Sequence, residues 1–237
     1  MKPKNIFLVR HGESIGNVDK RVYDSIPDYA LPLTKRGEDQ AYSVGQSLQK
    51  IIGGGEVRFY VSSLWRTRQT FLHIQKSFQN ISYYEDPRLR EQEWSTNLES
   101  TSEYRDILEE YRNNYGSFYY RFHNGGESCS DVFNRLSDFM NTLYRDFESS
   151  EFPDNVIIIS HGMTMRVFLM RFFHCSVEEF ESWRNPKNCQ YYHLKLENEK
   201  YSLTTPLSIY KKSKHNYKFD WGNNTQFSTS KLPIINT

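Results

Sequence analysis

The sequence predicts an α/β fold with a mainly parallel central sheet. Short apolar runs that are typical of buried strands alternate along the chain with segments in which apolar residues recur at helical spacing. Such alternation indicates crossover connections, which join parallel strands. With 237 residues, the chain is long enough to bury a substantial core.

In the first half of the chain, the sequence pattern predicts alternating strands and helices. Thr34 is a favourable N-cap for a helix that ends at Gly53. The segment from Asp19 to Pro32 has no periodicity, so we expect a loop there. The other predicted elements of this half are strands at 4–9, 57–62 and 81–85 and a helix at 67–78.

The second half continues the pattern up to about residue 210. A helix with an apolar face from Val132 to Leu143 is expected to be capped by Ser128 or Ser130. The other predicted elements are a polar helix at 101–115, a very apolar strand at 156–159, an apolar helix at 163–173 and strand-like runs at 189–197 and 200–209. Lys, Asn, Ser and Thr dominate afterwards, which predicts one domain over 1–210 and an irregular tail over 211–237.

Overall charge excludes several classes of partner. The chain has 30 basic and 29 acidic residues, a balance that argues against nucleic acid or an anionic membrane as partner. The three cysteines, Cys129, Cys175 and Cys189, form no close pair, which argues against a disulfide framework or a zinc site. No apolar stretch is long enough for a membrane span. We therefore expect a cytoplasmic protein, as a monomer or a homodimer.

Chemically active side chains follow three of the predicted strands. In open α/β sheets, ligands bind beyond the carboxyl ends of the strands, so these side chains are expected to meet at one edge. Each alone has an ordinary structural explanation, such as a hydrogen-bonded histidine or an arginine on a solvated helix face. They are Arg10-His11, Ser62-Ser63 followed by Arg66, and Ser160-His161.

Two histidines beside two arginines suit chemistry at a phosphate group. The planar guanidinium of arginine matches phosphate oxygens bidentately, and neutral imidazole is a nucleophile at phosphorus. Two nearby cations disfavour the imidazolium form of His11 and so help to keep it nucleophilic. We expect His11 to attack a phosphomonoester that Arg10 and Arg66 hold, while His161 shares the charge of the transition state.

The leaving alkoxide of such a reaction needs a proton donor. The stretch LREQEWS, residues 89–95, offers Glu91 and Glu93 after Pro87. Spacing alone does not choose between the two carboxyl groups.

Six motifs together resemble the histidine phosphatase superfamily, also called phosphoglycerate mutase-like. They are LVRHGESIGN at 8–17, PLTKRGEDQA at 32–41, VSSLWRTRQT at 61–70, LREQEW from residue 89, GGES at 125–128 and SHG at 160–162. The resemblance implies a three-layer α/β/α fold and a phosphohistidine intermediate formed without a metal or other cofactor. It covers about residues 4–175.

The resemblance also implies a role for particular residues. His11 is the nucleophile, and Glu91 is the proton donor because the family glutamate follows a leucine at this spacing. The Gly12 carbonyl fixes the tautomer of the nucleophile. The implied phosphate ligands are Arg10, Asn17, Arg66 and His161.

A closer resemblance concerns a subgroup of phosphoglycerate mutase-like proteins and broad-specificity phosphatases of fungi, plants and bacteria. It rests on RLREQEW together with YGSFYYRFHNGGES at 115–128. Some phosphatases of the superfamily carry a glutamine at the place of Tyr23. A tyrosine there puts a ring and a hydroxyl near the site, which leaves the choice of substrate open.

Three kinds of function are compatible with these motifs. A phosphatase would hydrolyse a small phosphorylated metabolite, and a sugar bisphosphatase is one variant; a mutase would return the phosphoryl group to another hydroxyl. A mutase needs extra cations, yet 92–117 supplies only Arg105 and Arg112 among several acidic residues, which favours the phosphatase. A non-catalytic phospholigand-binding scaffold would be expected to lack His11, Arg66 or His161, and all three are present.

Overall fold

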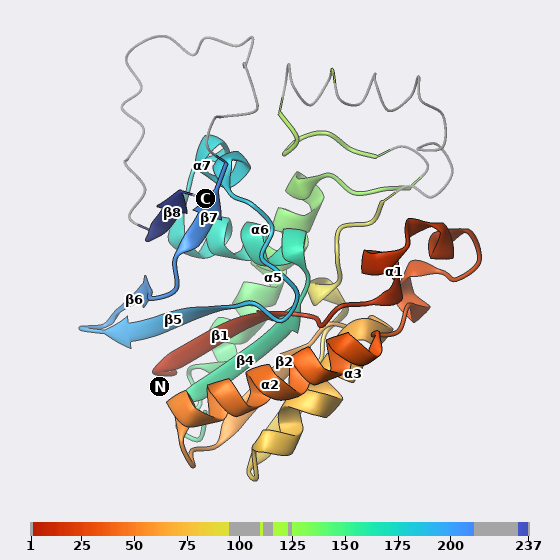
Figure 1. Ribbon diagram of the computed structural model, residues 1–237. Coiled ribbons are helices and arrows are strands. Elements are labelled where there is room, and N and C mark those ends of the chain that lie inside the picture. The colour runs from red at the N-terminus through yellow and green to blue at the C-terminus, as the bar shows by residue number, and fades with distance from the viewer. Residues whose placement is uncertain (1, 95–109, 111–115, 123–124, 211–231, 237) are drawn as a thin grey trace, which may run out of the picture. The chain divides into compact units, whose positions relative to one another are not determined.

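The computed structural model describes residues 2–94, 110, 116–122, 125–210 and 232–236 (Figure 1). The chain divides into two compact units. The first comprises Met1–Glu91, Asp138–Met165 and Pro186–Thr205, and the second comprises Gln92–Ser137, Arg166–Asn185 and Pro206–Thr237. Except for Glu110, the helix predicted over 101–115 lies outside the described residues, as does most of the predicted 211–237 tail.

The first unit is built on a six-stranded sheet with the order β3-β2-β4-β1-β5-β6. Its strands are β1 (Asn5–Arg10), β2 (Val57–Val61), β3 (Ile81–Glu85), β4 (Asn155–Ser160), β5 (Tyr191–Glu197) and β6 (Lys200–Leu203). The four strands β3, β2, β4 and β1 are mutually parallel, whereas β5 and β6 are antiparallel to their neighbours. The predicted α/β fold with a mainly parallel sheet is therefore confirmed.

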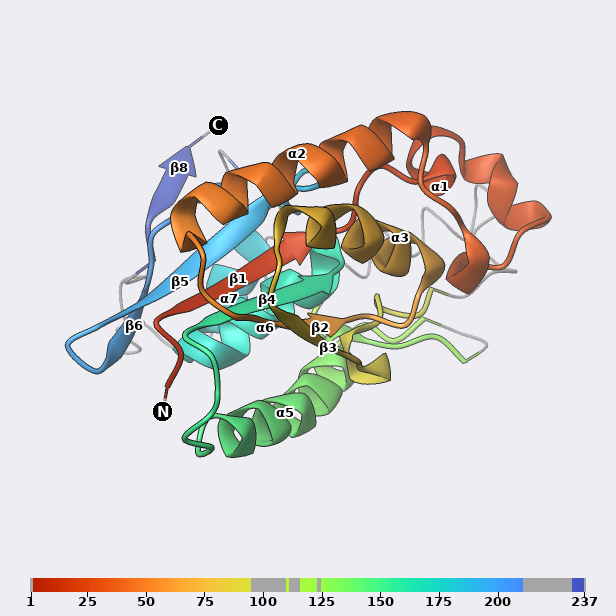
Figure 2. The same cartoon turned by 90° about the horizontal axis from the view of Figure 1, so that it is seen from below.

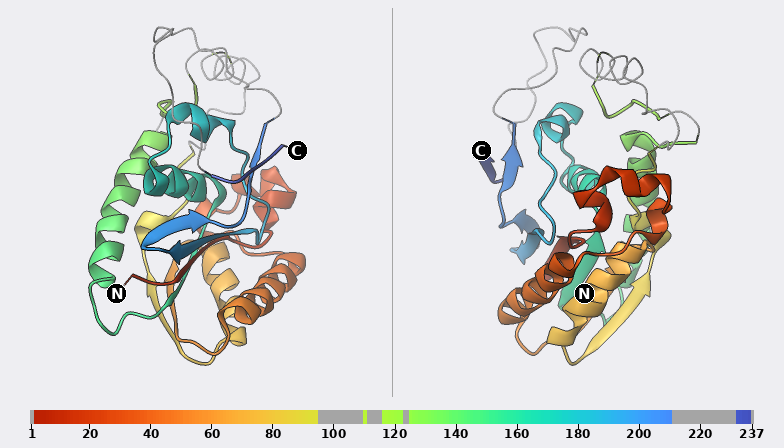
Figure 3. Two further views of the ribbon diagram at one scale, coloured as in Figure 1. Left: turned by 90° about the vertical axis from the view of Figure 1, so that its left-hand side faces the viewer. Right: turned by 45° about the vertical axis from the view of Figure 1, so that its right-hand side comes forward.

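Helices cover both faces of this sheet, as Figures 2 and 3 show. On one face, α2 (Lys35–Ile52) and α3 (Trp65–Ile74) pack on the strands. On the other face, Phe139 of α5 (Cys129–Asp146) contacts Tyr60 of β2 with ring centroids 5.5 Å apart. The core under α2 and α3 consists of buried apolar side chains, among them Phe7, Val9, Val44, Leu48, Phe59, Phe71, Ile157 and Ile159.

The first long helix begins and ends where the sequence predicts. Thr34 Oγ1 accepts a hydrogen bond from the Gly37 amide at 3.0 Å, which satisfies a free N–H of the first turn of α2. Gly53 ends the helix with φ of 73°, a backbone conformation that favours glycine. The predicted loop 19–32 contains two short 3₁₀ turns, Lys20–Asp24 and Asp28–Ala30.

Backbone hydrogen bonds align the carboxyl ends of the parallel strands. Arg10 lies opposite Ser160 in the register of β1 and β4. The ladder extends past the strands, because the His11 amide donates to the Ser160 carbonyl and the Ser62 amide to the Ile159 carbonyl, both at 3.0 Å. The three strand ends that carry polar side chains therefore meet at one edge of the sheet, as predicted.

Two predicted elements differ in the structure. The run 200–209 is not one strand: β6 ends at Leu203, and Pro206, which lacks an N–H, separates it from β7 (Leu207–Ile209). The helix predicted at 67–78 begins at Trp65 and ends at Ile74, followed by a 3₁₀ turn.

The second unit contains the first part of α5, most of α6 (Gly162–Phe173), α7 (Val177–Ser182), and β7 paired in parallel with β8 (Ile234–Asn236). Ser128 is the residue that caps α5, since its Oγ accepts from the Asp131 amide at 3.1 Å. The α7 helix was not predicted; Ser176 and Glu179 form its capping box. Among the described residues, no helix is long and apolar enough to cross a membrane.

Close backbone packing joins the start of α2 to the segment after β1. A Cβ built on Gly37 would lie 2.1 Å from the Glu13 carbonyl oxygen, and one on Gly12 would lie 2.4 Å from the Gly37 carbonyl oxygen. No side chain fits at such distances. The absence of Cβ atoms at these two glycines therefore positions the residues around His11.

We predict that Gly37→Ala lowers the free energy of unfolding by about 1–3 kcal/mol, although alanine is the better helix former. Gly54→Ala is the matched control, because a Cβ at Gly54 meets no atom within 4 Å. Its effect should stay within about 0.5 kcal/mol. Urea unfolding of both variants measures this, and a Gly37→Ala protein as stable as the wild type would contradict the packing argument.

Candidate active site

Three buried side chains and one partly buried side chain form a group at the carboxyl edge of the sheet, here called the histidine–arginine cluster. The buried members are His11, Arg66 and His161, and the partly buried one is Arg10. His11 is 3% exposed and Arg66 is 4% exposed, while His161 is fully buried. The two imidazole rings lie 5.2 Å apart, centroid to centroid. The structure thus brings together the residues that the sequence predicted to meet.

One hydrogen bond orients His11. Its Nδ1 lies 2.7 Å from the Gly12 carbonyl oxygen. A carbonyl only accepts hydrogen bonds, so Nδ1 carries the proton and Nε2 keeps its lone pair. Burial, followed by the charges of Arg66 and Arg10, lowers the pKa of His11 well below 6.5, and the bond to Gly12 opposes this only in part. His11 is therefore a neutral imidazole with an unprotonated Nε2.

The two arginines are each held at one end of the guanidinium group. Arg66 donates from Nη1 to the Asp28 carbonyl at 2.8 Å, and from Nη1 and Nη2 to the Asp28 carboxylate, both at 3.1 Å. Arg10 donates from Nη1 to the Pro186 carbonyl at 2.6 Å. The Nε of Arg10 is buried and has no acceptor among the described residues. Donors of both groups therefore remain available for an anion.

Two further groups are oriented by partners that the sequence did not single out for this role. His161 Nε2 lies 2.8 Å from the Ser62 hydroxyl. The Oδ1 of Asn17 accepts from the Ser14 amide at 3.0 Å and from Asn188 Nδ2 at 3.0 Å. Because the backbone amide is always a donor, Oδ1 is identified, and the Nδ2 donor of Asn17 faces the other way. Asn188 also donates to the His11 carbonyl at 3.2 Å.

The motif WRTRQT at the start of α3 fastens the cluster to the surrounding backbone. Thr70 Oγ1 accepts from the Gly12 amide at 3.0 Å and donates to the Arg66 carbonyl at 2.7 Å. Gln69 accepts from the Leu33 amide at 2.7 Å. These polar residues of the motif hold the segments that carry His11 and Arg66.

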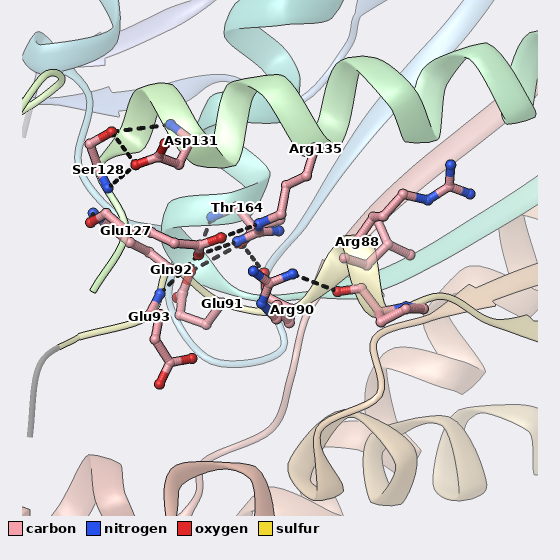
Figure 4. Close-up of polar contacts among 12 residues, drawn as sticks. Arg88, Arg90, Glu91, Gln92, Glu93, Glu127, Ser128, Asp131, Arg135 and Thr164 are labelled. Carbon is pink, nitrogen blue, oxygen red and sulfur yellow. Dashed lines mark hydrogen bonds and ion pairs between the residues drawn. The ribbon is translucent and has the colours of Figure 1, made fainter. Parts of the chain in front are cut away.

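Glu91 is held at the N-terminus of α6, as Figure 4 shows. Its carboxylate accepts from the Met163 amide at 3.3 Å, and from the Thr164 amide and hydroxyl at 3.2 and 3.1 Å. Glu91 also acts electrostatically on Arg10. Glu93 has an exposed side chain, and its amide donates to the carboxylate of Glu127 at 3.0 Å.

Tyr23 lies beside the cluster. A Cβ on Gly16 would lie 2.9 Å from the Tyr23 hydroxyl, so the ring packs over that glycine. Burial and the charge of Asp28 raise the pKa of Tyr23, and the positive charges of Arg66 and Arg10 act against this. The phenol is therefore neutral near pH 7 and within electrostatic range of both arginines.

No group of three or more His, Cys, Asp or Glu side chains in the described part of the chain is arranged to hold a metal ion. The site contains a neutral imidazole nucleophile, two guanidinium groups, a second imidazole, an amide donor and a carboxyl group. Together they can bind a phosphate group and exchange it at His11.

A mainly parallel sheet flanked by helices, with this cluster at its carboxyl edge, defines an enzyme of the phosphatase and mutase type. The chain belongs to the histidine phosphatase superfamily, branch 1, whose family model matches residues 6–206. The resemblance expected from the sequence motifs is thereby confirmed.

Individual relatives agree with this family. The chain is 40% identical over 211 residues to the phosphoglycerate mutase-like protein AT74H of Arabidopsis thaliana, covering 81% of this chain and 73% of that protein. It is 25% identical over 282 residues to the broad-range acid phosphatase DET1 of Saccharomyces cerevisiae, covering 79% and 84%. A solved structure of mycobacterial glucosyl-3-phosphoglycerate phosphatase has the same fold, with a TM-score of 0.66 at 21% identity over 84% of this chain and 96% of that one.

We predict that the ring of His11 titrates below pH 6.5 and that Arg66→Gln raises its midpoint, because one of the two charges that oppose protonation is removed. Activity that requires neutral His11 should therefore persist as pH falls through 6.5. Histidine titration by NMR measures both midpoints. The control is His193, whose pKa burial lowers to about 4. If Arg66→Gln left the His11 midpoint unchanged, the charge of Arg66 would not be a cause of the lowered pKa.

Proposed function

We propose that the protein is a phosphatase that hydrolyses small phosphomonoesters through a phosphohistidine on His11. One observation carries this proposal. His11 is buried with Nδ1 fixed by the Gly12 carbonyl and with two guanidinium groups beside it, so that Nε2 is an oriented nucleophile next to an anion site. Ordinary structural histidines do not need this combination.

The proposed reaction has two steps. In the first, His11 Nε2 attacks phosphorus, the ester P–O bond breaks, and Glu91 gives its proton to the leaving alkoxide. Arg10, Arg66 and His161 bind the phosphoryl oxygens, and Asn17 donates from Nδ2. In the second, water attacks phosphorus and gives its proton to Glu91, the P–N bond breaks, and inorganic phosphate and neutral His11 are released.

Two considerations support hydrolysis over a mutase reaction. A mutase must hold a second anionic group and so needs further cations near its substrate. Residues 92–117 contain only two arginines, Arg105 and Arg112, among Glu99, Glu103, Asp106, Glu109 and Glu110. In addition, one relative, which this chain matches over most of that protein's length, is named as a broad-range acid phosphatase.

We predict that the wild-type protein releases inorganic phosphate from members of a panel of small phosphomonoesters and that His11→Ala abolishes this release. Quenching the wild type during turnover with radiolabelled substrate should yield an acid-labile, alkali-stable phosphoenzyme that His11→Ala lacks. Release that survives in His11→Ala would overturn the mechanism. Interconversion of phosphoglycerates with a bisphosphoglycerate primer, without release, would identify a mutase.

We predict that Glu91→Gln slows hydrolysis of alkyl phosphates by about 10²–10⁴-fold, because the alkoxide loses its proton donor. Formation of the phosphohistidine from para-nitrophenyl phosphate should be far less affected in this variant, since nitrophenolate leaves without protonation. Glu93→Gln is the matched control and should retain activity. Equal burst rates for wild type and Glu91→Gln on alkyl phosphates would show that Glu91 is not the proton donor.

A further inference from the structure

Asp28 binds Arg66 through both its carboxylate and its carbonyl, and the proposed reaction does not use it. It lies in a short 3₁₀ turn, Asp28–Ala30, within the predicted loop 19–32. Its carboxylate and its carbonyl together accept three hydrogen bonds from Arg66. The Arg66 side chain is only 5% exposed, so Asp28 is the carboxylate that balances its buried charge.

The bonds to Asp28 determine which donors of Arg66 are left. A guanidinium group has five N–H donors in a fixed plane. Asp28 takes both hydrogens of Nη1 and one of Nη2, and no described residue accepts from Nε or from the second hydrogen of Nη2. Those two donors point along one edge, which is the geometry for bidentate binding of phosphate.

Asp28 is also a negative charge close to the place where a phosphate dianion binds. It acts electrostatically on Tyr23, which Arg10 and Arg66 also influence, so the four groups share one electrostatic environment. A carboxylate on one edge of Arg66 and a phosphate on the other repel each other through the same guanidinium. The side chain of Asp28 is 35% exposed, so the repulsion is screened only in part by water.

We propose that Asp28 is a positioning residue that acts through Arg66: it fixes the Nε–Nη2 edge as the phosphate-binding edge and, as an internal counter-anion, limits how tightly the site holds phosphate. The inference rests on the proposed function. Its consequence for a phosphatase is that inorganic phosphate, the last product, dissociates more readily than two unopposed guanidinium groups would allow.

The test is calorimetric titration of the full-length protein with inorganic phosphate, comparing wild type with Asp28→Asn. Asparagine keeps the main-chain carbonyl and one side-chain acceptor but removes the charge. We expect Asp28→Asn to bind phosphate about five- to tenfold more tightly, the order expected when one partly screened charge near an anion site is removed. The KM for a phosphomonoester should fall with it, whereas mere structural damage would weaken binding and raise KM.

Glu85→Gln is the matched control. Glu85 accepts two hydrogen bonds from Arg68, both at 2.6 Å. Arg68 lies in α3, like Arg66, but this ion pair is on the exposed surface. Its removal should leave phosphate affinity within about twofold of the wild type, as for other surface pairs. Asp28→Ser supplies a second neutral variant if Asp28→Asn does not fold.

The outcomes separate the two proposals. A folded neutral variant of Asp28 that binds phosphate with the same affinity as the wild type, or more weakly, would overturn the inference. It would leave the phosphatase proposal intact. An equal gain of affinity in Glu85→Gln would also overturn it, since the effect would be one of net charge. Failure of the wild type to bind phosphate at all would overturn both.

Discussion

The parallel register between β1 and β4 is the constraint on which the site depends. The ladder places Arg10 opposite Ser160 and continues for one more bond, from the His11 amide to the Ser160 carbonyl. This brings the imidazoles of two residues 150 positions apart to a centroid separation of 5.2 Å. A slip of one residue would turn every side chain of the shifted strand to the other face of the sheet and separate the pair.

Preorganisation then comes from partners that bind one end of each functional group and leave the other end for the ligand. The Gly12 carbonyl does this for His11, Asp28 for Arg66 and the Pro186 carbonyl for Arg10. Asn188 bonds in the same way to Asn17, and the Ser62 hydroxyl orients His161 through its Nε2. Fixed donors of this kind need no rearrangement when charge develops, and that is the main source of electrostatic catalysis.

Charge at the cluster is a compromise between opposing requirements. The guanidinium groups of buried Arg66 and partly buried Arg10 attract the phosphate and help to lower the pKa of His11, so that the imidazole stays neutral. The same charges would hold the product and would repel each other if nothing balanced them. Asp28, which is paired with Arg66, supplies part of that balance.

The sequence by itself determined the features that local patterns encode. Apolar runs and helical spacing gave the alternating strands and helices, Thr34 and Gly53 gave the limits of α2, and the strand-end motifs gave the histidine–arginine cluster. The choice of Glu91 over Glu93 came from the family motif rather than from spacing. Two local signals were missed: Pro206 divides the last predicted strand, and Ser176 with Glu179 caps the α7 helix. Tertiary structure alone decided the orienting partners. The reason is physical: the bonds between Arg66 and Asp28, His161 and Ser62, and Asn17 and Asn188 join residues 38, 99 and 171 positions apart, and no local pattern records which distant donor will meet which acceptor.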